Sequence, residues 1–146
     1  MRQEWFFLAF AAILIHGVHE GLASTAPVGG RLAPCPSSPN CVSSQSQDES
    51  HLVEPFAYKG TLSEAKERLL EVLRSMKRVR IVVSEGNYVH AEFTSAWFRF
   101  LDDVEFLFDD PSKTIHVRSA SRSGYYDFGV NRRRIESIRG AFQSSP

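Results

Sequence analysis

The residues best suited to bind or transform another molecule are concentrated near the end of the chain. Residues 118–137 hold five arginines and two acids, in a chain of 146 residues whose formal net charge is zero. Guanidinium groups bind carboxylates and phosphates through paired hydrogen bonds, so this stretch predicts a noncatalytic surface for a small anionic group or an acidic partner. The candidate ligand-binding residues are Arg118, Ser119, Ser121, Arg122, Asp127, Asn131, Arg132 and Arg134.

Two parts of the chain carry opposite net charges that cancel in the formal net charge of zero. Residues 48–111 hold 13 acids and 8 bases, and residues 112–146 hold 7 bases and 2 acids. The run from Arg132 to Arg134 opens a predicted helix, where free N–H groups and the helix dipole favour negative charge. The positive charge of these arginines would be balanced either by an outside anion or by internal carboxylates such as Asp103, Asp127 and Glu136. A neutral chain lacks a basic footprint, so no nucleic-acid partner is expected.

The second hypothesis is a hydrolase. His116, or a carboxylate of Asp103 or Glu105, would act as general base, with Ser119 or Ser121 as nucleophile. The sequence has no G-x-S-x-G motif and no metal-ligand cluster, which favours the noncatalytic module, and no cofactor or metal is expected. A third hypothesis is a purely structural domain in which all these charges pair internally.

The N-terminal segment predicts export. Arg2 is followed by an apolar run, Trp5–Ile15, and by the small residues of 21–26, which is the layout of a signal peptide. We expect cleavage after Ala23. The alternative, a membrane anchor, needs about 20 apolar residues, and this run is interrupted by His16, His19 and Glu20. The expected compartment is the periplasm, the exterior or an equivalent lumen, with no stable transmembrane segment in the mature chain.

Two cysteines, Cys35 and Cys41, lie in a stretch rich in proline and serine. An even cysteine count in an oxidising compartment favours a disulfide, and the spacing fits neither a zinc site nor a C-x-x-C redox pair. No strand or helix periodicity is visible there. The predicted organisation is therefore a signal peptide at 1–23, an arm with a disulfide at 24–51, and one α+β domain at 52–146.

Two helices are predicted in that domain. The first covers about residues 62–77, begins with a capping-box pattern at Thr61 and Glu64, and places apolar residues at steps of three and four. Those apolar residues are Leu62, Ala65, Leu69, Val72, Leu73 and Met76. The second covers about residues 131–142, with Ile135, Ile138 and Phe142 facing inward.

Alternating apolar and polar residues predict strands between the two helices. The expected strands lie near 79–83, 89–93, 97–108 and 114–119, with a further short strand within 53–59. Together they make an antiparallel meander of four or more strands packed with the helices, an α+β fold. Helices on one face leave the other open to solvent, so polar residues on that face are candidates for function.

The expected strand register predicts which residues of neighbouring strands lie opposite each other. A three-residue turn at 85–87 would set Val83 opposite Val89. The next hairpin would pair Phe106 with Ile115, Glu105 with His116 and Asp103 with Arg118.

Asp102 falls in phase with apolar residues, where an unpaired carboxylate is costly to bury. A bulge at residues 101–103 that turns Asp102 outward is favoured. The alternative is a paired Asp102, with Ser119, Ser121 or Arg122 as donor.

Three separated motifs carry a resemblance to a known family. "PCPSSPNCVSS", "FLDDVEFLFDD" and "IHVRSASRSGYYDFGVNRRRIESIR" together resemble the domain of unknown function 1499 family over about residues 32–142. The resemblance implies an exported or membrane-associated protein, and it does not imply any enzymatic activity. The matching positions are Cys35, Cys41, Ser43, Ser44, Asp103, Glu105, Arg118, Ser119, Ser121, Arg122, Gly124, Asp127, Gly129, Asn131, Arg132 and Arg134.

Overall fold

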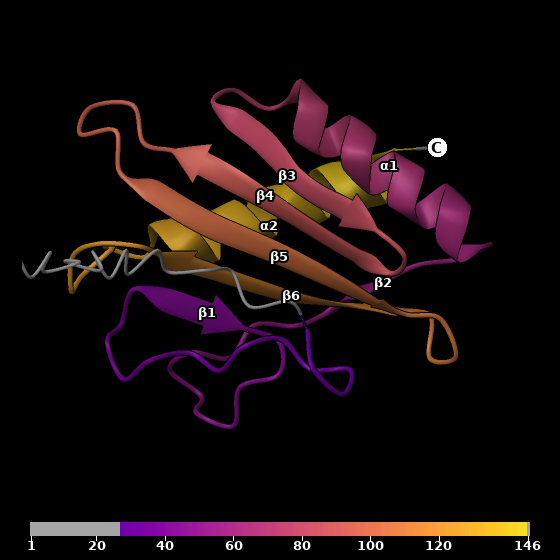
Figure 1. The fold of residues 1–146 in the computed structure, drawn as a ribbon, viewed down its shortest axis with the longest axis horizontal. Helices are drawn as coiled ribbons and strands as arrows, with labels where there is room; N and C mark the ends of the chain where they lie inside the picture. The colour runs from indigo at the N-terminus through magenta and orange to yellow at the C-terminus, as the bar shows by residue number, and fades with distance from the viewer. Residues whose placement is uncertain (1–26, 146) are drawn as a thin grey trace, which may run out of the picture.

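The computed structural model describes residues 27–145, so the predicted signal peptide lies outside the described residues. The strands are β1 (Cys41–Ser43), β2 (Phe56–Ala57), β3 (Val79–Glu85), β4 (Tyr88–Thr94), β5 (Leu101–Asp109) and β6 (Thr114–Ser121). The helices are α1 (Leu62–Ser75) and α2 (Val130–Ser144). The sheet is antiparallel in the order β1-β6-β5-β4-β3, and β2 pairs with β6 on the same edge as β1 (Figure 1). The α+β prediction is confirmed.

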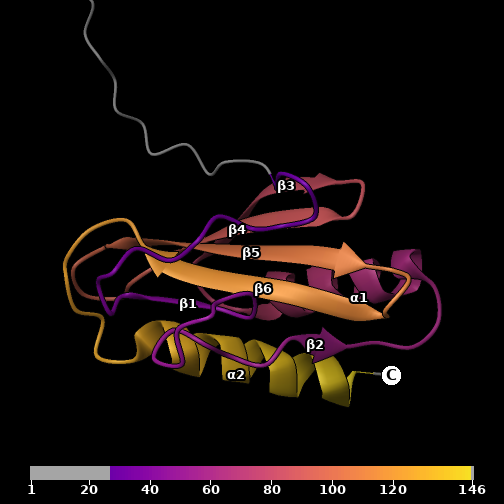
Figure 2. The ribbon, with the colours of Figure 1, turned by 90° about the horizontal axis from the view of Figure 1, so that it is seen from below.

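Both helices cover one face of the sheet (Figure 2). Because strand side chains alternate, every second residue of each strand meets the helices, and these residues form the main core. On the strands the core includes Phe56, Val89, Ala91, Phe93, Val104, Phe106, Phe108, Ile115 and Val117. The helices contribute Ala65, Leu69, Leu73, Ile135, Ile138 and Phe142, as their periodicity predicts. None of the helices within residues 27–145 is long and apolar enough to cross a membrane.

The ends of the helices follow from local chemistry. At the start of α1 the predicted capping box is present, since Glu64 N donates to Thr61 Oγ1 and Thr61 N donates to Glu64 Oε2. The first turn of α2 is held by Asp127 instead, whose carboxylate accepts hydrogen bonds from the N–H groups of Gly129 and Asn131. A carboxylate at a helix N-terminus also offsets the helix dipole.

The structure corrects the predicted registers. Phe106 pairs with Val117, Glu105 with Arg118 and Asp103 with Ala120, two residues away from the predicted partners on β6. A shift of two leaves each side chain on its predicted face, so the alternation alone does not exclude it.

In the first hairpin, Val83 lies opposite His90 rather than Val89. A bulge between Ile81 and Val83 turns Val83 to the helix-free face, where it packs against Tyr88 and Leu107. The turn has two residues, Gly86 and Asn87, rather than three.

The start of β5 is also corrected. The strand begins at Leu101, so Trp97, Phe98 and Phe100 lie in an exposed loop rather than in a strand. No bulge interrupts the pairing of β5 with either neighbour, so Asp102 stays on the helix face and is buried.

The segment before residue 52 contains a strand that the sequence pattern does not predict. β1 pairs with β6 through residues 41–43, and Val42 joins the main core. Three residues are too few to show a period of two. Cys35 and Cys41 form a disulfide, as predicted, which ties the preceding loop to the start of β1.

Candidate functional site

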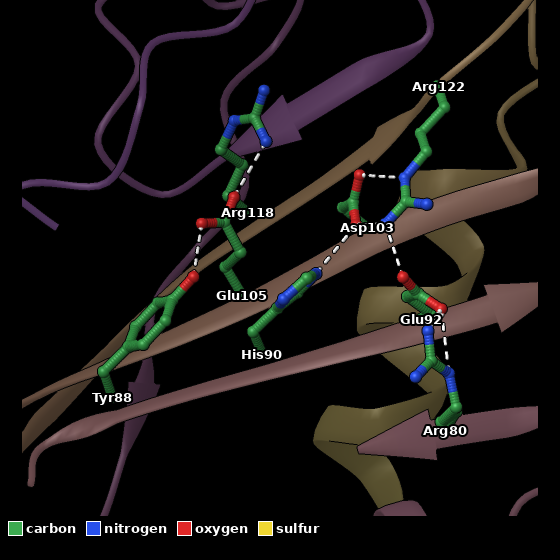
Figure 3. Close-up of polar contacts among 8 residues, drawn as sticks. All are labelled: Arg80, Tyr88, His90, Glu92, Asp103, Glu105, Arg118 and Arg122. Atoms are coloured by element: carbon green, nitrogen blue, oxygen red, sulfur yellow. Dashed lines mark hydrogen bonds and ion pairs between the residues drawn. The ribbon is translucent and has the colours of Figure 1, made fainter. Parts of the chain in front are cut away.

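The helix-free face of the sheet carries a polar cluster in which three carboxylates are buried. We define the polar cluster as Arg80, Tyr88, His90, Glu92, Asp103, Glu105, Arg118 and Arg122 (Figure 3). These residues come from β3, β4, β5 and β6 and the residue after β6, at positions that alternate with the core. Burial of Glu92, Asp103 and Glu105 without partners would be very unfavourable, and the arginines of the cluster offset this cost by pairing with them.

Half of the cluster centres on Asp103. His90 Nε2 lies 2.7 Å from Asp103 Oδ1, and Arg122 donates to both oxygens of Asp103 at 2.7 and 2.8 Å. Arg122 also donates to Glu92 at 2.6 Å, and Arg80 donates to the other oxygen of Glu92. The chain of contacts therefore crosses the sheet from β3 to the end of β6 (Figure 3).

These contacts change proton affinities. Burial by itself would raise the pKa of Asp103, but the hydrogen bonds from His90 and Arg122 outweigh it and hold that pKa well below its usual range. Glu92 responds in the same way, because the hydrogen bonds from Arg122 and Arg80 lower its pKa against the effect of burial. The hydrogen bond to Asp103 raises the pKa of Arg122. Both carboxylates are therefore ionised at neutral pH.

The other half of the cluster centres on Glu105, which is 1% exposed. Tyr88 Oη donates to one oxygen of Glu105 at 2.7 Å, and Arg118 Nη1 donates to the other at 2.8 Å. Arg118 Nε is also buried, yet it has no hydrogen-bond partner among residues 27–145. A buried N–H without an acceptor is unusual in a folded protein and points to a missing partner.

A pocket of about 600 Å³ lies over parts of both halves of the cluster. Its floor is formed by Asp103, Glu105, Arg118 and Arg122, and Ala33 to Pro36 of the disulfide loop form a wall. The start of the loop after β6, at Ser123 and Gly124, completes the lining. We call this space the Arg118 pocket.

The predicted ligand-binding residues divide between the two faces of the sheet. Arg118 and Arg122 reach the Arg118 pocket, whereas Arg134 and Asn131 lie on the helix face. There Arg134 donates to Asp102, Ser119 and Asn131, so the alternative of a paired Asp102 is correct but the donor differs from the three predicted. Ser121 lines the Arg118 pocket but also accepts from Asn131, and Asp127 holds the start of α2.

Arg132 contacts backbone rather than a carboxylate. Its guanidinium donates to the carbonyl oxygens of Ser50 and Leu52 at 2.9 and 2.7 Å. Arg122 and Arg134 thus pair with carboxylates of the chain, and Arg118 does so in part. The negative charge at the start of α2 is supplied by Asp127.

The residues of the hydrolase hypothesis come together only in part, since Ser121, Asp103 and Glu105 line the Arg118 pocket but His116 and Ser119 do not. His116 Nδ1 lies 3.4 Å from Ser44 Oγ, which accepts from Val117 N. Ser119 lies on the opposite face of β6, fully buried, and donates to Asn131. Glu105 and Asp103 contact Arg118 and Arg122 instead of His116. No group of His, Cys, Asp and Glu in residues 27–145 is arranged to hold a metal ion.

Half of the cluster was not predicted from the sequence, namely Arg80, Tyr88, His90 and Glu92. The signal was present on β4, where Tyr88, His90 and Glu92 alternate with core residues. A strand with three hydrogen-bonding side chains on its outer face, beside a strand with two carboxylates, indicates a paired network.

The fold and the cluster define an α+β protein with two helices on one face of an antiparallel sheet and a buried network of charges on the other. The chain belongs to the family described as protein of unknown function (DUF1499), whose model matches residues 31–142. This confirms the resemblance found in the three motifs. No curated protein matches the chain.

Proposed function

We propose that this protein is a noncatalytic module that binds a small anionic group in the Arg118 pocket. The observation that carries the proposal is the buried Nε of Arg118, which has no acceptor among the described residues. The guanidinium of Arg118 donates one hydrogen bond within residues 27–145, from Nη1 to Glu105, so Nε and Nη2 have no acceptor there. Two N–H groups in that fork match two oxygens of a carboxylate, phosphate or sulfate.

The chemistry of the pocket favours an acceptor-rich ligand despite its two carboxylates. Both oxygens of Glu105 and both oxygens of Asp103 already accept hydrogen bonds. The guanidiniums keep unused donors, since Arg122 uses only Nε and Nη2 among the described residues. A ligand that offers oxygens therefore completes the network, whereas a cation would meet carboxylates that are already neutralised.

The pocket also limits the size of the ligand. A volume of about 600 Å³ holds a small molecule or the terminal group of a larger one, and the disulfide loop restricts access from one side. Arg132 lies outside this lining, and Arg134 is used on the other face, so neither belongs to the proposed site.

Export is part of the same proposal. The apolar run at 5–15 and the small residues after it support a signal peptide cleaved after Ala23, and a disulfide persists in an oxidising compartment. The module would then meet its ligand in the periplasm, outside the cell or in an equivalent lumen.

A thermal-shift titration tests the binding. Phosphate, sulfate and acetate are compared with chloride at equal ionic strength, because a ligand at 100 times its Kd adds about 2.7 kcal/mol to the free energy of unfolding. We expect at least one oxyanion to raise the melting temperature of the parent protein. Arg118→Lys keeps a charge near Glu105 but removes the paired donors, so it should abolish that rise.

Arg74→Lys is the matched control, because Arg74 lies on the exposed side of α1 and pairs only with Glu67 among the described residues. The control should respond like the parent. If no oxyanion acts differently from chloride, or if Arg118→Lys responds fully, the proposed function is wrong and internal pairing is the role of these charges.

A further inference from the structure

Two loops at one end of the sheet expose an unusual number of aromatic side chains. We define the aromatic tip as Trp97, Phe98 and Phe100 of the β4–β5 loop together with Tyr125, Tyr126 and Phe128 of the β6–α2 loop. Trp97 is 90% exposed and Phe128 is 79% exposed. Large apolar side chains gathered on a surface mark a binding region rather than ordinary exposure.

The two loops are neighbours in space. Asp102 at the start of β5 pairs with Ser121 at the end of β6, and Arg122 N donates to Leu101 O just beyond that pair. Both loops therefore leave the sheet at the same end, on the left in Figures 1 and 2. Ala96 of the first loop and Val130, the first residue of α2 directly after the second loop, also line one shallow hollow.

Each loop contains one residue with a left-handed backbone conformation. Arg99 and Phe128 have φ angles of 54°, in the left-handed region that side chains larger than glycine rarely adopt. Within each loop the rings contact each other, with Phe98 5.5 Å from Phe100 and Tyr126 5.5 Å from Phe128. The rings therefore shield each other rather than pack into the core.

Basic residues lie near the aromatic tip. Lys77, Arg78 and Arg133 line the same hollow as Ser95 and Ala96 of the first loop, and Arg99 lies within that loop. None of these four forms an ion pair with a carboxylate of residues 27–145. The acid of the second loop, Asp127, is occupied by backbone N–H groups at the start of α2. The tip thus combines apolar rings with uncompensated positive charge.

We infer that the aromatic tip binds the surface of a lipid bilayer that contains anionic lipids. Tryptophan and tyrosine favour the boundary between headgroups and acyl chains, and phenylalanine inserts beside them. Lysine and arginine at the same level attract anionic headgroups. The charge complementarity and the position of the rings on two adjacent loops favour a membrane over a flat protein interface. This site lies outside the Arg118 pocket and does not depend on the proposed anion binding.

The fluorescence of Trp97 tests the inference. The chain has two tryptophans, so the full-length Trp5→Phe protein reports from Trp97 alone. Vesicles of phosphatidylcholine with about one third phosphatidylglycerol are compared with phosphatidylcholine vesicles, with and without brominated acyl chains. We expect a blue shift and bromine quenching on the anionic vesicles, both weakened at high salt.

Two variants in the Trp5→Phe background make the result specific. Phe98→Ser with Phe128→Ser should remove the blue shift and most of the quenching, even if the apolar run at 5–15 holds the chain on the vesicle. Val28→Ser, at an exposed apolar residue outside the aromatic tip, should leave both signals unchanged. Circular dichroism checks that each variant is folded.

Two results would overturn the inference. One is Trp97 emission that does not change when anionic vesicles are added, or that brominated acyl chains quench equally in the Phe98→Ser, Phe128→Ser protein. The other is a blue shift that grows with protein concentration in the absence of lipid, which would assign the tip to contacts between copies of this chain.

Discussion

Arg134 on α2 and Asp102 on β5 form a buried ion pair between the helix layer and the sheet, with side chains 10% and 7% exposed. Arg134 also lies over the ring of Phe93 and donates to Ser119 and Asn131, so its guanidinium is held on several sides. Removal of one partner from a buried pair leaves an uncompensated charge. We predict that Arg134→Ala lowers the free energy of unfolding by about 3 to 5 kcal/mol.

Arg133→Ala is the control for that prediction. Arg133 is exposed and donates to the carbonyl of Phe128, so its loss should change the free energy of unfolding by less than about 1 kcal/mol. Urea denaturation of the parent and both variants measures the difference. Equal effects of the two substitutions would show that the ion pair is not important for stability.

The helices could be predicted from the sequence because their signals are local. The capping box at Thr61 and the periodic apolar residues lie within a few turns of each other, and both helices form where expected. The strand register could not be predicted as well, since a two-residue shift keeps every side chain on its face. The bulge before Val83 could not be predicted from the pattern of apolar residues.

The candidate site could be predicted only in part, because strand alternation assigns side chains to a face but does not identify their partners. The alternation placed Asp103, Glu105 and Arg118 on the open face, and that holds in the structure. The partner of Asp102 could not be found from spacing, because Arg134 lies 32 residues later and reaches the sheet only after α2 packs. The contacts of Arg132 could not be predicted, because backbone carbonyls, its partners in the structure, have no signature in the sequence.

Acid should destabilise the protein partly through Asp103. The folded pKa lies below the ordinary value of 3.8, so the stabilisation is complete above that pH and is lost as the pH falls toward the folded pKa. The unfolded chain binds the proton first, so stability falls with pH in that window. Glu92 adds to the loss below its ordinary value of 4.5.

Asp103→Asn checks this account. At pH 7 it should cost about 2 kcal/mol, because Arg122 and His90 lose a charged acceptor. The difference in the free energy of unfolding between variant and parent should narrow from pH 5 to about pH 3, since the unfolded parent chain binds a proton at Asp103 in this range while the folded carboxylate stays ionised. Denaturation curves at several pH values measure this difference. A difference that stays constant with pH would contradict the assignment.

Loss of the disulfide should weaken both the fold and the Arg118 pocket. A loop this short contributes about 2 to 3 kcal/mol in the chain-entropy model, and here it also tethers β1 and forms a wall of the pocket. We expect the Cys35→Ser, Cys41→Ser protein to be less stable by at least that amount and to bind oxyanions less tightly. Reductant should reproduce the loss in the parent and leave the double variant unchanged.

Export predicts the mass of the mature protein. If the signal peptide is cleaved after Ala23, the protein recovered from its native compartment begins at Ser24 and contains no free thiol. Intact-mass measurement and alkylation without reductant check both points. A chain that keeps Met1, or one that alkylates at both cysteines, would contradict export through a cleaved signal.

The most direct test of the Arg118 pocket is a crystal structure grown with the oxyanion that gives the largest thermal shift. We predict density for the anion with two oxygens about 2.7 to 3.2 Å from Nε and Nη2 of Arg118, between the disulfide loop and the sheet. An empty pocket with the anion bound at Arg132 or Arg133 instead, or with no anion bound at all, would contradict the proposed function.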